Sequence, residues 1–175
     1  MTEDLRYPIG NYIPQVFSHK QKEAWLLDIK FLPEELEIAV QNLDAYQLQT
    51  PYREGGWTVQ QLVHHVADSH MNAYIRFKLA LTEHNPTIKP YEEKEWAKLN
   101  DVNTVPINVS LTLLHALHQR WYATIKDLTE EQWELTVFHP EHKKEISLWH
   151  FLGMYAWHGR HHVKHITALR ERNGW

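Results

Sequence analysis

The chain has no cysteine, no long apolar run and no dense basic block. Without cysteine no disulfide can staple the fold, and any bound metal must use nitrogen and oxygen ligands. No stretch approaches the roughly 18–20 apolar residues of a membrane-spanning helix, and the acidic start has no signal-peptide core. The formal net charge of −4 argues against a nucleic-acid partner. We therefore expect a soluble, cytoplasmic protein.

The composition is that of a folded protein. Hydrophobic residues make up 43% and aromatic residues 12% of the 175 residues, which excludes a disordered chain. This length predicts a single domain over residues 1–175. Fourteen histidines and eight tryptophans are its unusual features. Because the histidines are neither contiguous nor terminal, they are not a purification tag.

The first forty residues predict an arm and a broken helix. Residues 1–17 mix prolines with aromatic residues without any period, which is typical of an extended arm. A helix should begin near Ser18 or His19. We expect Pro33 to interrupt it and Glu34–Leu43 to continue as a new helix, since proline favours the first turn.

The rest of the chain predicts three more helices. Thr58 and Gln61 match a capping box, and Ser147 can cap the last helix. The helices are expected over residues 58–82, 111–128 and 148–171. Residues 84–108, with three prolines and one expected helical turn, form a long connection, and strand signals are weak throughout. This pattern predicts an all-α fold, a four-helix bundle with a long crossover connection.

Histidines interrupt the apolar face of the last helix. His158, His162 and His165 are spaced by four and three residues, which places their rings on one face. Two imidazoles one turn apart can bind one ion at roughly 2.0–2.1 Å. Burying an unpaired imidazole costs on the order of 1–3 kcal/mol, so the rings need a metal, a buried carboxylate or each other. His161 projects away and should be a supporting or surface residue.

A second cluster lies almost a hundred residues earlier. The helical period makes His70 the most inward of its histidines, puts His65 on the flank and turns His64 outward. Asp68 could hold His64 or His65 from behind and fix the tautomer of a metal ligand. The period favours His70 as a ligand without excluding His65. An exposed, histidine-rich helix face is the alternative.

Several other candidate residues each allow more than one role. No general base can be assigned, and Asp68 is better suited to orienting a ring than to accepting a proton. Arg160 could contact an anionic substrate or simply be solvated. Trp149 and Trp157 could line a pocket or pack in the core.

Several motifs together resemble the DinB-like superfamily, and most closely its YfiT-type branch of metal-dependent hydrolases from bacilli. The resemblance covers nearly the whole chain, and the combination is specific although each motif alone is weak. The segments that carry it are Tyr7–Gly10, Thr50–Arg53, Gly55–Val59, His64–Asn72, Ile75–Lys78, Tyr155–His158 and Gly174–Trp175.

The resemblance implies a four-helix bundle in which three histidines bind one divalent metal. By position these are His65, the latter member of the His-His pair, with His158 and His162. It also implies a homodimer that acts on a small molecule, and it relates the chain to bacillithiol transferases. An all-histidine site suits zinc or nickel, and also cobalt or iron. The chain differs from the family pattern at Gly159-Arg160.

Three neutral histidines leave coordination positions open, which is typical of catalytic sites. The ion's charge could lower the pKa of water toward roughly 7 for hydrolysis, or stabilise a thiolate nucleophile. We therefore predict a metal-dependent hydrolase. The alternatives are a thiol S-transferase that acts on electrophiles, a non-catalytic bundle locked by its metal, and a protein-interaction bundle without metal.

Overall fold

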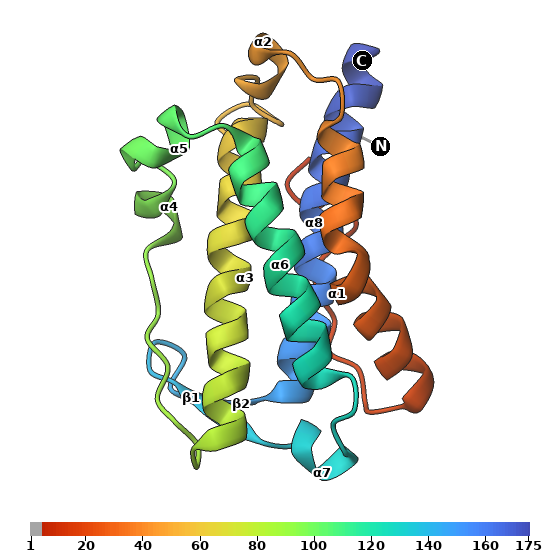
Figure 1. Cartoon of the computed structure of the whole chain (residues 1–175), viewed down its shortest axis with the longest axis vertical. Helices are drawn as coiled ribbons and strands as arrows, with labels where there is room; N and C mark the ends of the chain where they lie inside the picture. The colour runs from red at the N-terminus through yellow and green to blue at the C-terminus, as the bar shows by residue number, and fades with distance from the viewer. Residues whose placement is uncertain (1–4) are drawn as a thin grey trace.

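Four long helices lie side by side in the computed structural model, which describes residues 5–175 (Figure 1). Helices α1 and α8 run one way, and α3 and α6 run the other. Each helix packs against two of the others. The long helices are α1 (His19–Val40), α3 (Val59–Thr82), α6 (Ile107–Ile125) and α8 (Leu148–Asn173). The short ones are α2 (Ala45–Leu48), α4 (Glu93–Trp96), α5 (Asn100–Thr104) and α7 (Glu130–Trp133). The predicted four-helix bundle is confirmed.

The connection from α3 to α6 sets the topology. Residues 83–106 return along the outside of α3, carrying α4 and α5, so α6 starts at the same end of the bundle as α3 (Figure 1). The predicted long crossover is therefore present, with a second short helix that the sequence did not indicate. One consequence is that α3 and α8 become antiparallel neighbours.

Local side chains start the helices where the sequence indicated. The backbone amide of Gln61 donates to the Thr58 hydroxyl at 3.1 Å. The backbone amide of Thr58 donates to the side-chain oxygen of Gln61 at 2.9 Å. The Ser147 hydroxyl accepts from the His150 amide at 3.2 Å. Both predicted N-caps are confirmed, and each satisfies amides that have no partner within the helix.

Helix α1 continues through Pro33 without a break, so the predicted interruption is wrong. Leu32 and Leu36 are buried on either side of the proline, and this packing outweighs its local cost. Helix α8 comes close at this level, since a Cβ on Gly159 would lie 2.8 Å from the Leu32 methyls. Because proline has no amide hydrogen, the carbonyl of Ile29, four residues earlier, receives no bond from within the helix.

A small hairpin precedes the last helix, although the sequence showed only weak strand signals. Strands β1 (Thr136–His139) and β2 (Lys144–Ser147) pair antiparallel, with Thr136 opposite Ser147. The turn places Lys143 at a φ of 51°. β-branched and aromatic residues in β1 favour this pairing, and the buried Val137 ties it to the bundle.

The N-terminal arm runs along helix α8. Trp149 donates its indole hydrogen to the Gln15 carbonyl at 2.7 Å, and Trp157 donates to the Gly10 carbonyl at 3.1 Å. From residue 5 to residue 17 the arm contains no helix or strand, as expected. Residues 1–4 of the predicted arm lie outside the described residues.

The core has two apolar parts separated by histidines. One part is rich in aromatic side chains and the other in aliphatic ones. Between them lies a group that we call the histidine layer, made of His65, His70, His118, His158 and His162. Within the described residues, no helix is both long enough and apolar enough to span a bilayer.

A candidate metal site between helices α3 and α8

Three imidazole nitrogens converge between α3 and α8. The Nε2 atom of His158 lies 3.2 Å from Nε2 of His65 and 3.0 Å from Nε2 of His162. One ring nitrogen from each of these residues, which we call the triad, lies within 4.8 Å of the other two. Nitrogens about 2.0–2.1 Å from one ion lie roughly 3.0–3.4 Å apart in octahedral or tetrahedral sites. The spacing therefore suits a single bound cation.

Burial keeps the triad neutral. His65 is 5% exposed and His162 is 7% exposed, while His158 is partly exposed. Desolvation lowers the pKa of His65 to about 4 and, with the neighbouring rings, holds the pKa values of His158 and His162 well below the ordinary value. Neutral imidazoles keep the lone pair that a metal requires.

His70 lies behind the triad rather than within it. Its Nε2 atom is 3.1 Å from Nδ1 of His158, and its Nδ1 atom is 3.0 Å from Nε2 of His118. The ring is completely buried, as the helical period indicated. Both of its nitrogens therefore face other histidines of the layer, and the ring backs His158.

His118, on α6, belongs to the same layer and was not predicted from the sequence. Its Nδ1 atom lies 2.5 Å from the Ile29 carbonyl oxygen, and burial lowers its pKa to about 4. It stands on the buried stripe of α6 between Leu114 and Trp121. A histidine at a core position of a third helix was the signal that could have identified it.

A second histidine group adjoins the triad. Nδ1 of His165 is 3.4 Å from Nδ1 of His162, and Nε2 of His165 is 3.3 Å from the Arg6 carbonyl oxygen. The His161 ring stacks on Trp157 with centroids 4.5 Å apart. His161 is buried rather than on the surface, and its Nδ1 atom has no hydrogen-bond partner within the described part of the chain.

His64 and Asp68 do not take the places expected for them. His64 is buried rather than turned outward, with Nδ1 2.8 Å from the Ser110 hydroxyl and Nε2 3.1 Å from the Val105 carbonyl. Across the described residues, no hydrogen bond joins the Asp68 carboxylate to a histidine. Burial, assisted by the charge of Asp101, raises the pKa of Asp68 to about 6. The ring-orienting contact expected from Asp68 to His64 or His65 is therefore not made, and the triad ring that another side chain orients from behind is His158, through His70.

The other candidate residues have structural partners. Arg160 forms an ion pair with Asp28 at 2.9 Å. Trp149 is buried in the aromatic part of the core, and Trp157 binds the arm. The tryptophan that touches the triad is Trp57, whose ring centroid lies 4.5 Å from that of His65.

Polar side chains continue from the triad toward the hairpin end of the bundle. Tyr155 lies one helical turn before His158 on α8. Arg76 donates to the Tyr155 hydroxyl oxygen at 2.8 Å. Because that oxygen accepts from Arg76, the phenolic proton remains available for another acceptor. Burial raises the pKa of Tyr155, so the hydroxyl stays protonated.

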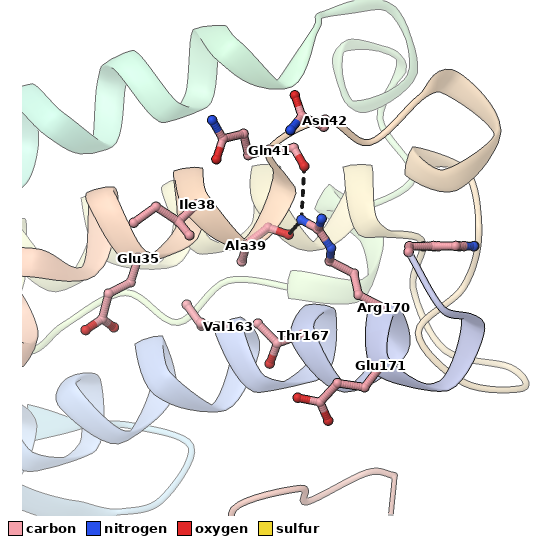
Figure 2. A pocket seen from close by; sticks show the side chains of 10 residues that line it. Glu35, Ile38, Ala39, Gln41, Asn42, Val163, Thr167, Arg170 and Glu171 are labelled. Atoms are coloured by element: carbon pink, nitrogen blue, oxygen red, sulfur yellow. Dashed lines mark hydrogen bonds between the residues drawn. The ribbon is translucent and has the colours of Figure 1, made fainter.

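Two cavities differ in their relation to the triad. One, of about 680 Å³, reaches Trp57 and His161, both next to triad residues. Its charged lining residues are Arg6, Arg53, Glu93, Lys94, Glu95 and Lys98. The other, of about 580 Å³, lies between the last turns of α1 and α8 (Figure 2). There Arg170 donates to the carbonyls of Ala39 and Gln41 at 2.9 and 3.0 Å, so it caps α1.

Known proteins resemble the chain over nearly its full length. A "Putative metal-dependent hydrolase" of Bacillus cereus is 54% identical over 173 residues, covering 98% of this chain and 99% of the relative. A protein of the same name from Bacillus anthracis is 53% identical with the same coverage. The solved structure of YfiT from Bacillus subtilis, described as a probable metal-dependent hydrolase with an unusual four-helix bundle topology, has a TM-score of 0.95. It is 50% identical, covering 98% of this chain and 99% of YfiT.

The DinB superfamily profile matches residues 29–166, a range that contains all three triad histidines and most of the bundle. The profile's coverage agrees with the resemblance found in the sequence motifs. So do the sequence identity to the relatives and the topology shared with YfiT. The chain belongs to the DinB superfamily.

Proposed function

We propose that this chain is a metal-dependent hydrolase in which His65, His158 and His162 bind one divalent ion, zinc or nickel. The observation that carries the proposal is the convergence of three neutral Nε2 nitrogens from two helices at 3.0–3.2 Å along the triad. The names of its relatives point the same way. Three nitrogen ligands leave positions for water or substrate.

The donor set fits a borderline divalent ion. All three ligands are uncharged, so the full charge of the ion is retained, and imidazole suits zinc and nickel. When bound, such an ion supplies a Lewis acid that polarises a carbonyl or lowers the pKa of water. The chain holds the three ring-nitrogen lone pairs of the triad in place, and burial keeps those nitrogens from being protonated.

Tyr155 is our candidate for a catalytic hydrogen-bond donor. Its oxygen accepts a hydrogen bond from Arg76, its proton has no acceptor among residues 5–175, and its ring centroid lies 6.2 Å from that of His158. A hydroxyl held in this way can donate to an oxygen that gains negative charge during hydrolysis. Tyr155→Phe should lower kcat without changing metal content.

The substrate is a small molecule that approaches from the cavity beside Trp57 and His161. Its lining carries both signs of charge, with Lys98 already paired to Glu95 at 2.6 Å. We also propose a cytoplasmic homodimer, as the family resemblance implies. Light scattering of the purified protein measures the dimer directly, and a monomeric mass would reject it.

The test is turnover with and without metal. Native protein is analysed for its metal content, then stripped with a chelator and reloaded with zinc or nickel. Each form is assayed on a panel of esters and amides and on a thiol with an electrophile. We expect about one ion per chain and ester or amide hydrolysis that is lost on stripping and restored on reloading.

The remaining outcomes each reject the hydrolase. Turnover of the thiol pair alone would identify the thiol transferase. No turnover, with a melting temperature that collapses on stripping, would identify a bundle locked by its metal. Absence of stoichiometric metal would leave a protein-interaction bundle.

A further inference from the structure

The hydrogen bonds behind the triad are directional, and their direction can be deduced. A carbonyl oxygen can only accept, so the ring nitrogen that faces it must carry a hydrogen. In a neutral imidazole the other nitrogen must then be an acceptor. One carbonyl at the end of a row of neutral histidines therefore fixes the tautomer of every ring in that row.

The first row starts at Ile29. His118 donates from Nδ1 to the Ile29 carbonyl oxygen, so its Nε2 accepts from Nδ1 of His70, 3.0 Å away. The Nε2 atom of His70 then accepts from Nδ1 of His158 at 3.1 Å. That leaves Nε2 of His158 with a lone pair directed into the triad.

Pro33 explains why the Ile29 carbonyl is available. In an uninterrupted helix this oxygen would accept the amide hydrogen of residue 33, but proline has none. An acceptor buried without a partner costs about 1–3 kcal/mol, and His118 supplies the missing donor. The proline inside α1 and the histidine row on the other three helices are thus parts of one arrangement.

The second row starts in the N-terminal arm. His165 donates from Nε2 to the Arg6 carbonyl at 3.3 Å, so its Nδ1 accepts from Nδ1 of His162 at 3.4 Å. Nε2 of His162 therefore also directs a lone pair into the triad. Its distance of 3.0 Å from Nε2 of His158 brings two acceptors together, a repulsive contact that a cation relieves.

We propose that these two rows, ending on the carbonyls of Ile29 and Arg6, fix the tautomers of His158 and His162 so that both Nε2 atoms are ready to bind the ion. The proposal rests on the proposed ligand set and adds His70, His118 and His165 as positioning residues. It also assigns a role to the group of His161, His162 and His165. Because Nδ1 of His162 carries its hydrogen toward His165, this group supports the triad and does not form a second metal site.

The test reads tautomers directly in the metal-free protein at pH 7.5. Imidazole ¹⁵N shifts and two-bond ¹H–¹⁵N couplings show which nitrogen of each histidine carries the hydrogen. We expect the Nδ1–H form at His118, His70, His158 and His162, and the Nε2–H form at His165. The Nε2–H form at His158 or His162, the form that free imidazole side chains favour, would overturn the proposal whether or not the protein hydrolyses anything.

Paired variants separate positioning from packing. His118→Leu fills the space but removes the row's donor and acceptor, whereas His118→Gln restores both through its amide. We expect His118→Leu to shift His158 toward Nε2–H and to weaken zinc binding about 10–100-fold, with His162 unchanged. His165→Leu should alter His162 and leave His158 unchanged.

The rescue variant and the ion count complete the test. His118→Gln should recover most of the affinity for zinc and the His158 tautomer, with a melting temperature equal to that of His118→Leu or higher. Equal zinc affinity in the leucine and glutamine variants would show that only packing matters and would overturn the proposal. Binding of two zinc ions per chain at saturation would equally overturn it, because the second group would then be a metal site.

Discussion

Helix α8 supplies two nitrogens of the triad and helix α3 supplies the third, but the two helices hold their ligands differently. His158 and His162 are each backed by a row of hydrogen bonds that ends on a carbonyl. Among residues 5–175 no such bond reaches Nδ1 of His65, and its ring rests against the ring of Trp57. Directional bonds fix a ring's rotation and its hydrogen, whereas packing fixes only its position. The α8 side of the site is therefore preorganised, and the α3 side is adjustable.

Removing a ligand is the largest test of this comparison. His65→Ala, His158→Ala and His162→Ala should each reduce bound metal from about one ion per chain to near zero, since two nitrogens hold an ion poorly. His70→Ala leaves all three ligands in place and should retain the ion at saturating zinc. Elemental analysis after gel filtration measures this, with His115→Ala, at a half-buried histidine paired with Glu37, as the matched control. Full metal content in His65→Ala would show that the α8 pair alone suffices.

Acid should destabilise the metal-free protein. The pKa values of His65 and His118 are about 4 in the folded state, below the ordinary value of 6.5, so the unfolded chain binds more protons. Stability is therefore complete above pH 6.5 and falls as the pH drops toward 4. Asp28 and Asp68, with pKa values raised to about 6, oppose this but are fewer than the buried histidines.

Urea unfolding of stripped protein from pH 7.5 to 4.5 measures the effect. We expect a loss on the order of several kcal/mol in the free energy of unfolding. His118→Leu should flatten the curve, because one neutral histidine is gone. A curve that rises on acidification would mean that the carboxyls dominate.

The substitution Trp57→Leu tests the α3 side of the site, where packing rather than a hydrogen bond holds His65. Loss of the indole should let the His65 ring rotate and so weaken zinc binding. The loss of affinity should be less than about tenfold, the smallest loss expected when a hydrogen-bonded positioning histidine is removed. Trp57→Phe should restore most of the affinity, because a ring again covers His65. Competition with a zinc chelator gives both affinities. An effect larger than that of His118→Leu would reverse the ranking of the two sides.

Pro33→Ala should have the smallest effect on the metal. The new amide hydrogen competes with His118 for the Ile29 carbonyl, so affinity for zinc should fall less than tenfold. The free energy of unfolding should rise by about 1 kcal/mol or more, since an interior proline penalises the helix. Opposite signs for affinity and stability exclude general loosening as the cause. Glu34→Ala, at the next and exposed position, is the control and should leave zinc affinity unchanged.

The sequence predicted the bundle because its signals are local. The helical period, the capping box at Thr58 and the cap at Ser147 each depend on residues within a few positions of one another. The hairpin was missed because its pairing depends on packing against the bundle. Pro33 was misjudged for a related reason, since burial of its neighbours holds the helix together.

The site was predictable only in part. The helical period placed His158 and His162 on the inward face of the last helix. For the third ligand it predicted only that His70 is more deeply buried than His65. Burial does not tell whether a ring faces the triad or stands behind it, because that depends on the neighbouring helix. The roles of His118 and Arg6 depend on contacts across 89 and 159 residues of chain, which no local pattern encodes.

These long separations also bear on when the site can form. Position 65 lies in α3 and is synthesised before positions 158 and 162, which belong to α8. The backing for position 162 then joins residue 165 to residue 6. A growing polypeptide that lacks α8 therefore has one coordinating side chain and no coordination sphere, so ion uptake must follow synthesis and docking of α8.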